Sequence, residues 1–486
     1  MIAMDRPFWK NTALLTALLI WPLLLFGHPP YFFDSVGYYQ GGKVGATFIA
    51  TKLHLAPPPE ELQTVPAADT ASAPAGNTTA SAPAPAADSV HKSKVARSII
   101  YSAMAYVLSW PDMSMALLAV AQAALTALVA AVALAAFGVA SWQMALIAGA
   151  VLGFLTPAAF VSLFILPDIY AGILVGAMAL LVGFRKRMTG PIQTLLVLIG
   201  ALSVSVHTSH PPLAFAMCCV GGLWLLLRPG DSLAGKFGSI VVMGLPLALG
   251  CVLVMLSGLI GFGEASVAPK RFPLTLARAI ENGPARWYLA EQCPKRRYAV
   301  CEVFGNKMPT TTGKFLWGPH GVVLSATPEQ MDRIRAEESE IVWRSTLAYP
   351  GEQLEQIAIA IPQQIVAIGM SEIRFNRHII PDGKGSIRML VVSKDRDTAV
   401  VVVEMLTYIS TALASLYLLL SVRKMTAAQR GALLMIVTGL LVNAIICAVF
   451  SAVSDRYQSR IIWLVPLFAL CLLFGRLRNG PARANA

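Results

Sequence analysis

Charged side chains are scarce in this sequence. They make up 13% of its 486 residues, against 56% for hydrophobic residues, and this charged share is about half of that usual in soluble domains. The mean hydropathy is +0.64. This balance excludes an ordinary soluble protein and favours an integral membrane protein. The net charge of +12 therefore bears on membrane orientation rather than on nucleic-acid binding, because the location of Lys and Arg matters more than their sum.

Several common sequence signals are missing as well. The chain has no P-loop, no Rossmann fingerprint and no chain-wide repeat, which argues against the nucleotide-binding sites and repeat architectures that these patterns define. The interrupted helix pairs of many transporters are also missing. The first apolar run lacks a small-residue cleavage site and continues into HPPYFF, so we expect it to remain as the first helix rather than to be a cleaved signal peptide.

Long apolar runs are plentiful. A spanning helix needs about 20 mostly apolar residues, and the sequence offers ten such stretches. We therefore predict an α-helical polytopic membrane protein with about ten transmembrane helices. The stretches lie at residues 11–27, 113–137, 142–164, 168–184, 191–206, 213–227, 237–261, 400–422, 430–450 and 461–475.

The positions of Lys and Arg orient these helices. If the N-terminus is cytoplasmic, the basic groups at residues 185–187, 228–236, 423–424 and 476–483 all fall on the cytoplasmic side, as the positive-inside rule requires. From this topology and the alanine-rich composition we predict a multi-pass protein of the bacterial inner membrane. Its active site would face the periplasm.

The same topology divides the chain into three parts. They are a transmembrane core of helices 1–7 at residues 1–261, which includes a first outer loop at 28–112; an extracytoplasmic domain at 262–399, inserted between helices 7 and 8; and helices 8–10 with a cytoplasmic tail at 400–486. The inserted segment is long enough for a small domain. It contains a strand-like run at 389–392 and a helical stretch rich in Glu and Arg at 329–343, so we predict a soluble α+β fold.

The first outer loop has three pieces. Residues 56–90 are rich in Pro, Ala, Ser and Thr and show no apolar period, which predicts a disordered linker. On either side, residues 35–54 and 92–110 mix Tyr or Trp and basic residues with apolar ones. This pattern predicts two helices that lie along the membrane interface.

Cysteine use separates the membrane from the outer domain. Five of the seven cysteines lie in apolar runs, where small core residues are expected, whereas Cys293 and Cys301 in CPKRRYAVC fall outside the membrane. In an oxidising compartment we predict a disulfide between them. Two thiols are too few for a structural zinc site.

Polar residues gather at the predicted outer face. They are Asp34, Asp112, Asp168, His207, His210, Asp455, Arg456 and Arg460. Each has a plain alternative: Asp112 and Asp168 follow prolines and could cap helices, the histidine pair could bind a metal, and the arginines could anchor lipid headgroups. Asp34 is the hardest to explain as a cap, because its aromatic and glycine-rich neighbours offer no evident partner. Because all of these residues are predicted to lie on the outer side of the membrane, we expect them to form one functional site.

The arrangement resembles a known enzyme class. Asp34 in FFDSVGYYQGG follows the first membrane helix, Asp168 stands in LPDIY between the third and fourth, and RYQSRIIWLVPLF begins the last helix. This pattern resembles the GT-C superfamily of integral membrane glycosyltransferases, which includes protein O-mannosyltransferases and the lipid A aminoarabinose transferase. The resemblance covers residues 1–261 and 451–475 but not 262–399. It implies transfer of a sugar from a polyprenyl-phosphate donor to a glycolipid, polysaccharide or protein acceptor, with inversion at the anomeric carbon. The partners would be the donor, the acceptor and the lipid bilayer, and no nucleic-acid partner is expected.

The resemblance also suggests roles for the polar residues. Asp34 would be the catalytic base, partly desolvated by its aromatic neighbours and so more basic than in water, while Gly37, Gly41 and Gly42 would permit close approach. Asp168 could position the acceptor or hold a divalent cation, magnesium or manganese, since the class has metal-using and metal-independent members. The donor phosphate would be bound by Arg456, Arg460, His207 and His210.

Two other classes of function stay open. The protein could be a non-catalytic membrane partner of a polysaccharide assembly or export machine, which would tolerate loss of Asp34. It could also be a transporter, although no ionisable residue lies near the middle of a predicted span, where an ion relay is expected. The sequence names neither the sugar nor the acceptor.

Overall fold

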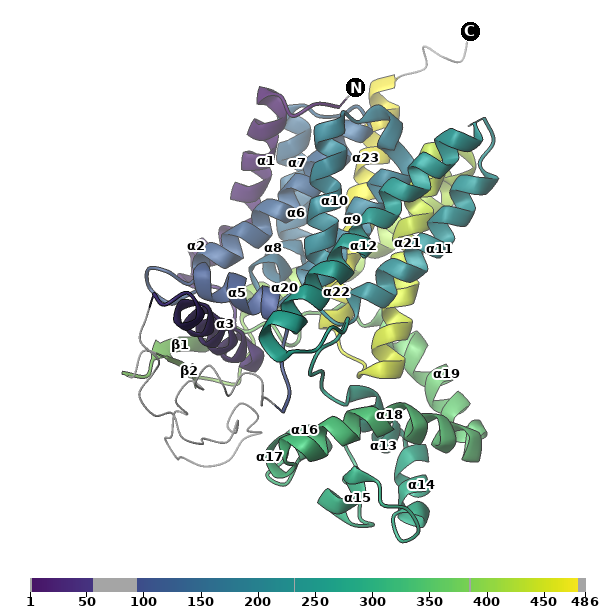
Figure 1. Cartoon of the computed structure of the whole chain (residues 1–486). Helices are drawn as coiled ribbons and strands as arrows, with labels where there is room; N and C mark the ends of the chain where they lie inside the picture. The colour runs from purple at the N-terminus through teal and green to yellow at the C-terminus, as the bar shows by residue number, and fades with distance from the viewer. Residues whose placement is uncertain (1, 56–93, 231, 384–385, 480–486) are drawn as a thin grey trace.

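The structure is a computed structural model that describes residues 2–55, 94–230, 232–383 and 386–479. Within these ranges the chain is mostly helical, with a single two-stranded sheet. Figure 1 shows a bundle of helices with both chain ends at the same end of the molecule, and a smaller group of helices beyond the opposite end. The predicted linker at 56–90 lies outside the described residues.

Seven helices of the described residues are long and apolar enough to cross a membrane, which is compatible with a multi-pass membrane protein. They are α6 (Ala116–Ala136), α9 (Ile169–Phe184) with the turn η1 (Arg185–Arg187), α11 (His210–Leu227), α12 (Leu233–Phe262), α20 (Thr398–Ser421) with η2 (Val422–Lys424), α21 (Ala427–Phe450), and α22 (Arg456–Ile462) together with α23 (Leu464–Asn479). Each overlaps one of the ten predicted stretches.

The other three predicted spans are shorter or broken helices. Residues 11–27 divide into α1 (Arg6–Leu19) and α2 (Trp21–Phe26), residues 142–164 into α7 (Trp142–Phe154) and α8 (Ala158–Leu163), and residues 191–206 form α10 (Gly190–Ser205). Pro22 and Pro157 stand at the two breaks. A proline lacks the backbone N–H that continues a helix and disfavours helical geometry before it. The count of ten spanning helices is therefore not confirmed.

Basic residues gather at the end of the bundle where the termini lie. Ile2 pairs with Met188 next to η1, and Arg187 donates to the carbonyl of Ala136 at 3.4 Å. On the other side of this end, Arg476 of α23 donates to Ser421 Oγ at 2.7 Å. Segments distant in sequence thus meet here, and the basic groups that orient the predicted topology share one end of the molecule.

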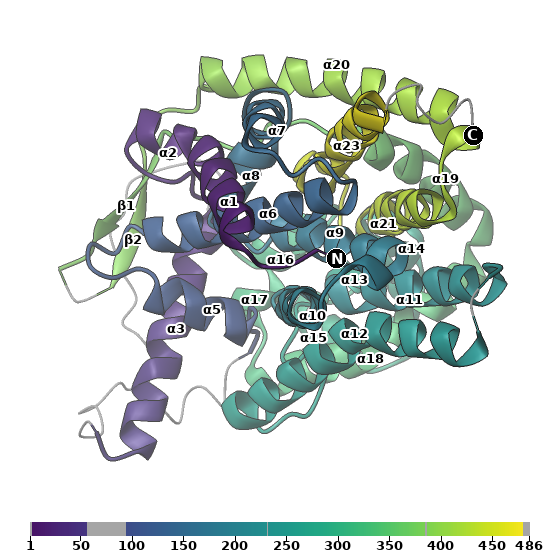
Figure 2. The same cartoon turned by 90° about the horizontal axis from the view of Figure 1, so that it is seen from above.

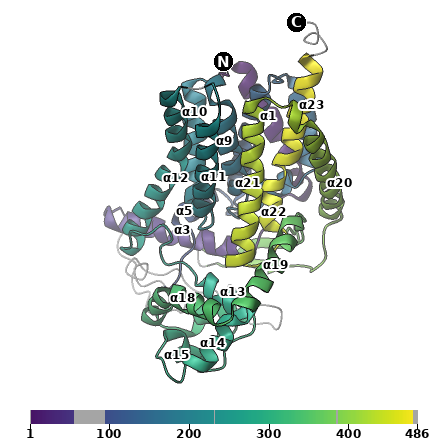
Figure 3. The same cartoon turned by 90° about the vertical axis from the view of Figure 1, so that its right-hand side faces the viewer.

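The opposite end of the bundle is crossed by α3 (Phe33–Lys52) and α5 (Ile99–Val107). The two helices pack against each other, and Figures 2 and 3 show α3 running across the bundle axis and extending beyond it. Glycine makes the packing close, because a Cβ at Gly42 would lie 2.1 Å from the carbonyl oxygen of Ser102. Helices therefore form in both segments predicted as surface helices.

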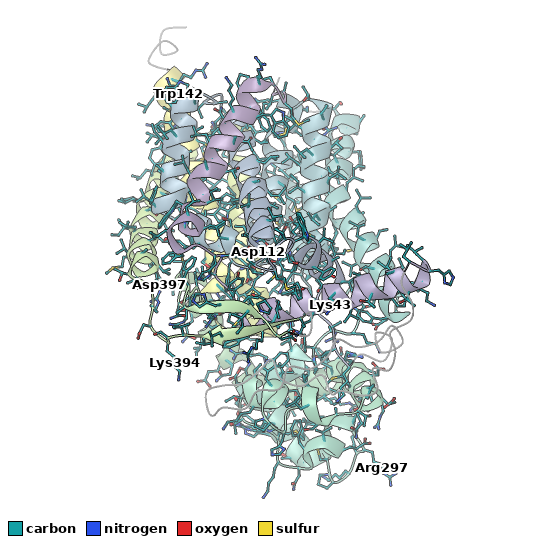
Figure 4. The ribbon with its side chains drawn as sticks, turned by 90° about the vertical axis from the view of Figure 1, so that its left-hand side faces the viewer. Lys43, Asp112, Trp142, Arg297, Lys394 and Asp397 are labelled. Carbon is teal, nitrogen blue, oxygen red and sulfur yellow. A yellow bond between two sulfur atoms is a disulfide. The ribbon has the colours of Figure 1, made fainter. Side chains whose placement is uncertain are left out.

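Beyond this end lies a group of helices with its own core. It comprises α13 (Leu274–Asn282), α14 (Pro284–Gln292), α15 (Ala299–Phe304), α16 (Thr312–Trp317), α17 (Val322–Ser325) and α18 (Pro328–Ala348). Thr327 and Gln330 form a capping box that starts α18, the predicted Glu- and Arg-rich helix. In Figure 4, Arg297 marks the far tip of this group and Trp142 the opposite end of the molecule. Cys293 and Cys301 are joined by a disulfide.

The two strands do not belong to that core. Strands β1 (Arg377–Pro381) and β2 (Ile387–Val391) pair antiparallel after α19 (Pro350–Val366). Ile387 and Phe375 pack in the main cluster of the bundle, where the rings of Phe375 and Phe26 stack with centroids 3.8 Å apart. The predicted strand-like run at 389–392 overlaps β2, but one α+β domain at 262–399 is not confirmed. The part with a separate core is helical, because the apolar face of the hairpin is buried against the bundle.

Candidate functional site

Asp34 lies in the first turn of α3. The start of this helix is fixed by Ser35, whose Oγ accepts from the Phe32 N–H at 2.9 Å and donates to the Ile165 carbonyl at 2.9 Å. The carboxylate of Asp34 accepts a 2.6 Å hydrogen bond from Arg97 Nη2, just before α5. Sequence reasoning missed Arg97, which follows Lys92 and Lys94 at the end of the polar part of the loop.

The pair changes the expected basicity of Asp34. Burial raises the pKa of this carboxyl group, but the positive charges of Arg97 and Arg456 and the hydrogen bond from Arg97 outweigh burial, so the pKa lies below its ordinary value. The prediction that desolvation makes Asp34 more basic is therefore wrong for the chain without substrate. The side chain stays one-third exposed, so a ligand can reach it.

The glycines of α3 make room for protein rather than for a ligand. A Cβ at Gly37 would lie 2.5 Å from Arg97 Nη1, and one at Gly41 would lie 3.1 Å from Ser102 Oγ. Gly42 meets the backbone of the same residue. The close approach predicted for these positions is that of α5 and the segment before it, and it brings Arg97 to Asp34.

Asp168 and Arg460 form a second ion pair, inside the protein. Arg460 Nη1 donates to Asp168 Oδ1 at 3.0 Å, and Nη2 donates to Asn443 Oδ1 at 2.6 Å. Asp168 stands at the N-cap position of α9, but its side chain makes no capping hydrogen bond, so the alternative of a side-chain cap is wrong. The Arg460 side chain has no exposed surface and that of Asp168 has 5%. The predicted roles of Arg460 at a phosphate and of Asp168 at an acceptor or cation do not fit this burial.

The two histidines lie beside this pair. His207 Nδ1 accepts from the Ser209 N–H at 3.2 Å and lies 2.8 Å from Ser209 Oγ, while His210 Nδ1 lies 2.5 Å from the Ser203 carbonyl. Burial and the charges of Arg460 and Arg456 lower the pKa of His207 to about 3. Its ring is therefore neutral near pH 7.

Arg456 is the more exposed of the two arginines of α22, with 19% of its side chain exposed against none for Arg460. Its guanidinium lies 4.8 Å from the ring centre of Phe32 and 4.9 Å from that of Tyr457. Its Nε lies 3.4 Å from Glu372 Oε2. Arg456 and Arg460 both contact the Tyr457 ring from the same helix, yet only Arg456 lies close enough to Asp34 to lower the pKa of that residue.

The two remaining predicted acids are Asp112 and Asp455, and only Asp112 forms a local turn. Asp112 Oδ1 accepts from the N–H of Ser114 at 3.1 Å and from its hydroxyl at 2.8 Å, which forms a turn before α6 rather than a cap on it. Asp455 precedes α22 and makes no capping hydrogen bond from its side chain. Among the described residues, no group of three or more His, Cys, Asp or Glu side chains could hold a metal ion.

Comparison of the chain with protein-family models, with curated proteins and with solved structures found no match. Function must therefore be argued from the site itself. The site combines one accessible carboxylate, Asp34, with Arg97 bonded to it and Arg456 nearby. Such an arrangement can hold an anion next to a base that accepts a proton.

Proposed function

We propose that this chain is a membrane glycosyltransferase of the GT-C type. It would transfer a sugar from a polyprenyl-phosphate donor to an envelope glycolipid, polysaccharide or protein acceptor. One observation carries the proposal: the one-third exposed carboxylate of Asp34 lies at the end of an apolar helix bundle, bonded to Arg97 and close to Arg456. A base and a cationic site for a leaving phosphate are the two parts that this reaction requires.

The proposed reaction is a single displacement at the anomeric carbon of the sugar. The acceptor oxygen forms a bond to this carbon while the bond from the carbon to the phosphate oxygen breaks. Asp34 takes the proton of the acceptor hydroxyl. Arg456 balances the charge that grows on the departing lipid phosphate, because a guanidinium matches phosphate oxygens in charge and in geometry. Attack opposite to the leaving group inverts the configuration.

The low pKa of Asp34 fits this scheme if Arg97 changes partner. Without substrate, Arg97 keeps Asp34 ionised. A bound donor phosphate would compete with the carboxylate for Arg97. Loss of that bond would raise the pKa of Asp34, because only the charge of Arg456 would then oppose burial. The base would thus gain strength only once the donor is bound.

The location of the site fits an outward-facing enzyme. The site lies at the end of the bundle opposite to the basic residues beside η1 and α23. With those residues in the cytoplasm, the site faces the periplasm of a bacterial inner membrane, beside the headgroup of a lipid-linked donor. We propose no metal ligand, since Asp168 is committed to Arg460.

The test compares envelope glycolipids and polysaccharides by mass spectrometry. Cells would carry the wild-type protein, Asp34→Asn at matched abundance, or no protein. We expect one sugar to be missing alike in the mutant and the deletion. The matched control is Asp112→Asn, an acid at the same end of the bundle that bonds only to Ser114 among the described residues. A mutant equal to wild type, with an altered deletion strain, would favour the partner or transporter hypothesis.

A further inference from the structure

The ring of Phe32 lies next to two guanidinium groups that come from different parts of the chain. Arg456 of α22 lies 4.8 Å from the ring centre. Arg377 of β1 lies 5.5 Å from the same centre and 5.0 Å from that of Phe33. Aromatic faces attract cations, so the residues just before Asp34 hold both arginines at the start of α3.

Arg377 is a buried cation without an acidic partner. The residue is 8% exposed, and its Nη1 donates to the carbonyls of Tyr31 at 3.2 Å and Glu372 at 3.4 Å. Among the described residues no carboxylate lies within ion-pair distance of it. Burial and the charge of Arg374 lower the pKa of Arg377. Its Nε and Nη2 make no hydrogen bond to another described side chain or carbonyl, so they can donate to a ligand.

The hairpin holds this arginine in a fixed position. Phe375, two residues before Arg377, stacks on Phe26 of α2, and Arg377 itself pairs with Val391 of β2. A planar guanidinium that is positioned before a ligand arrives loses less entropy when it binds. The β1–β2 hairpin, which follows the helical group in the sequence, therefore packs on the bundle and places the guanidinium of Arg377 beside Phe32 and Phe33.

We propose that Arg377 and Arg456 together form the binding site for the phosphate group of the lipid-linked donor. The inference rests on the proposed function and adds a residue outside the membrane helices to the donor site. The phosphate would enter over Phe33, which is 36% exposed, beside the one-third exposed Asp34. Two guanidiniums can each donate two hydrogen bonds to its oxygens. The carboxylate of Glu372 partly neutralises the charge of Arg456. Arg377 therefore supplies a second positive charge for the phosphate.

The experiment measures binding of farnesyl phosphate and of uncharged farnesol to the purified full-length chain in detergent by isothermal titration calorimetry. Arg377→Gln removes the charge, Arg377→Lys keeps it, and Arg374→Gln is the matched control, since Arg374 donates to the carbonyl of Asp395 at 3.1 Å on the exposed surface. We expect Arg377→Gln to weaken farnesyl phosphate binding at least about tenfold, as loss of a charged hydrogen bond does. Farnesol binding should not change, and Arg377→Lys should recover part of the loss.

The outcomes separate this inference from the proposed function. If Arg456→Gln weakens farnesyl phosphate binding but Arg377→Gln does not, the role of Arg377 is overturned and the proposed function stands. If Arg377→Gln weakens both ligands alike and lowers the melting temperature, Arg377 only ties β1 to the start of α3, and the inference fails. If the wild-type chain binds farnesol as tightly as farnesyl phosphate, the inference and the proposed function both fail.

Discussion

Arg460 of α22 donates a 3.0 Å hydrogen bond to Asp168 at the start of α9, and solvent reaches almost none of either side chain. The pair joins two segments that are 292 residues apart in the sequence. Asn443 of α21 accepts a second bond from the same guanidinium. The position of Arg456, one turn before Arg460 on α22, therefore depends on an ion pair buried inside the protein.

Breaking this pair should destabilise the protein. Asp168→Asn leaves the buried charge of Arg460 without its counter-ion, which typically costs about 3–5 kcal/mol. We expect a lower melting temperature in detergent by differential scanning fluorimetry. Asp168→Asn combined with Arg460→Met removes both charges and should recover part of the loss. A single variant that melts like wild type would show that the pair does not stabilise the fold.

The contact between α3 and α5 gives a second prediction. A Cβ at Gly42 would lie 2.1 Å from the backbone oxygen of Ser102, whereas one at Gly45 would meet nothing within 4 Å. Gly42→Ala should therefore force the helices apart and cost about 1–3 kcal/mol. Gly45→Ala, in the same helix, should be neutral or stabilising by up to about 1 kcal/mol, because alanine favours helix. Equal melting temperatures for the two variants would contradict the packing.

Local pattern predicted the helices well and their partners poorly. The seven long apolar helices and the helix at 328–348 overlap predicted stretches, because hydropathy and periodicity are local properties. The surface on which the β1–β2 hairpin packs could not be predicted in this way. Whether Ile387 packs on the helical group or on the bundle depends on contacts with residues far away in sequence.

The same limit applies to the site. Asp34 stood out by its surroundings, but the residues that set its charge state, Arg97 and Arg456, come from other segments. Arg377 lies in a segment that the resemblance did not cover, so no motif pointed to it. Arg460 seemed available for phosphate because four-residue spacing puts it near Arg456. Spacing does not reveal that Asp168 holds it inside the protein.

Arg97 should control the pH dependence of transfer, if the proposed function is correct. Arg97→Gln removes the charge and the hydrogen bond that oppose the effect of burial, so the pKa of Asp34 should rise. The carboxylate would then accept a proton at higher pH. We expect the acidic limb of the pH profile of kcat/KM, which reports the enzyme without bound donor, to move to higher pH.

The check is the rate of sugar transfer to acceptor at limiting donor between pH 4 and pH 9 for wild type and Arg97→Gln. The control is Arg374→Gln, since Arg374 donates to the carbonyl of Asp395 on the exposed surface. An unmoved acidic limb in Arg97→Gln would mean that Asp34 is not the group that titrates. A fall in rate that is the same at every pH would instead assign Arg97 to donor binding alone.

His207 should make the fold sensitive to acid. Its pKa is about 3 in the folded chain, against 6.5 for an unperturbed histidine, so between these values the unfolded chain binds a proton that the folded chain does not. Stability therefore falls as the pH drops below about 6.5, by about 1.4 kcal/mol per pH unit for one such group. His28, whose pKa burial also lowers, adds to this slope.

His207→Asn should reduce the slope, because asparagine does not titrate and its Oδ1 can accept from the Ser209 N–H in place of Nδ1. The measurement is the melting temperature in detergent at half-unit steps from pH 4.5 to pH 7.5. The variant should lose less stability than wild type as the pH falls, and exposed His54→Asn serves as the control. Parallel curves for wild type and His207→Asn would mean that His207 takes up its proton without unfolding. In that case the His207 ring has room to turn away from Arg456 and Arg460. The region around these two arginines is then less rigid than its hydrogen bonds imply.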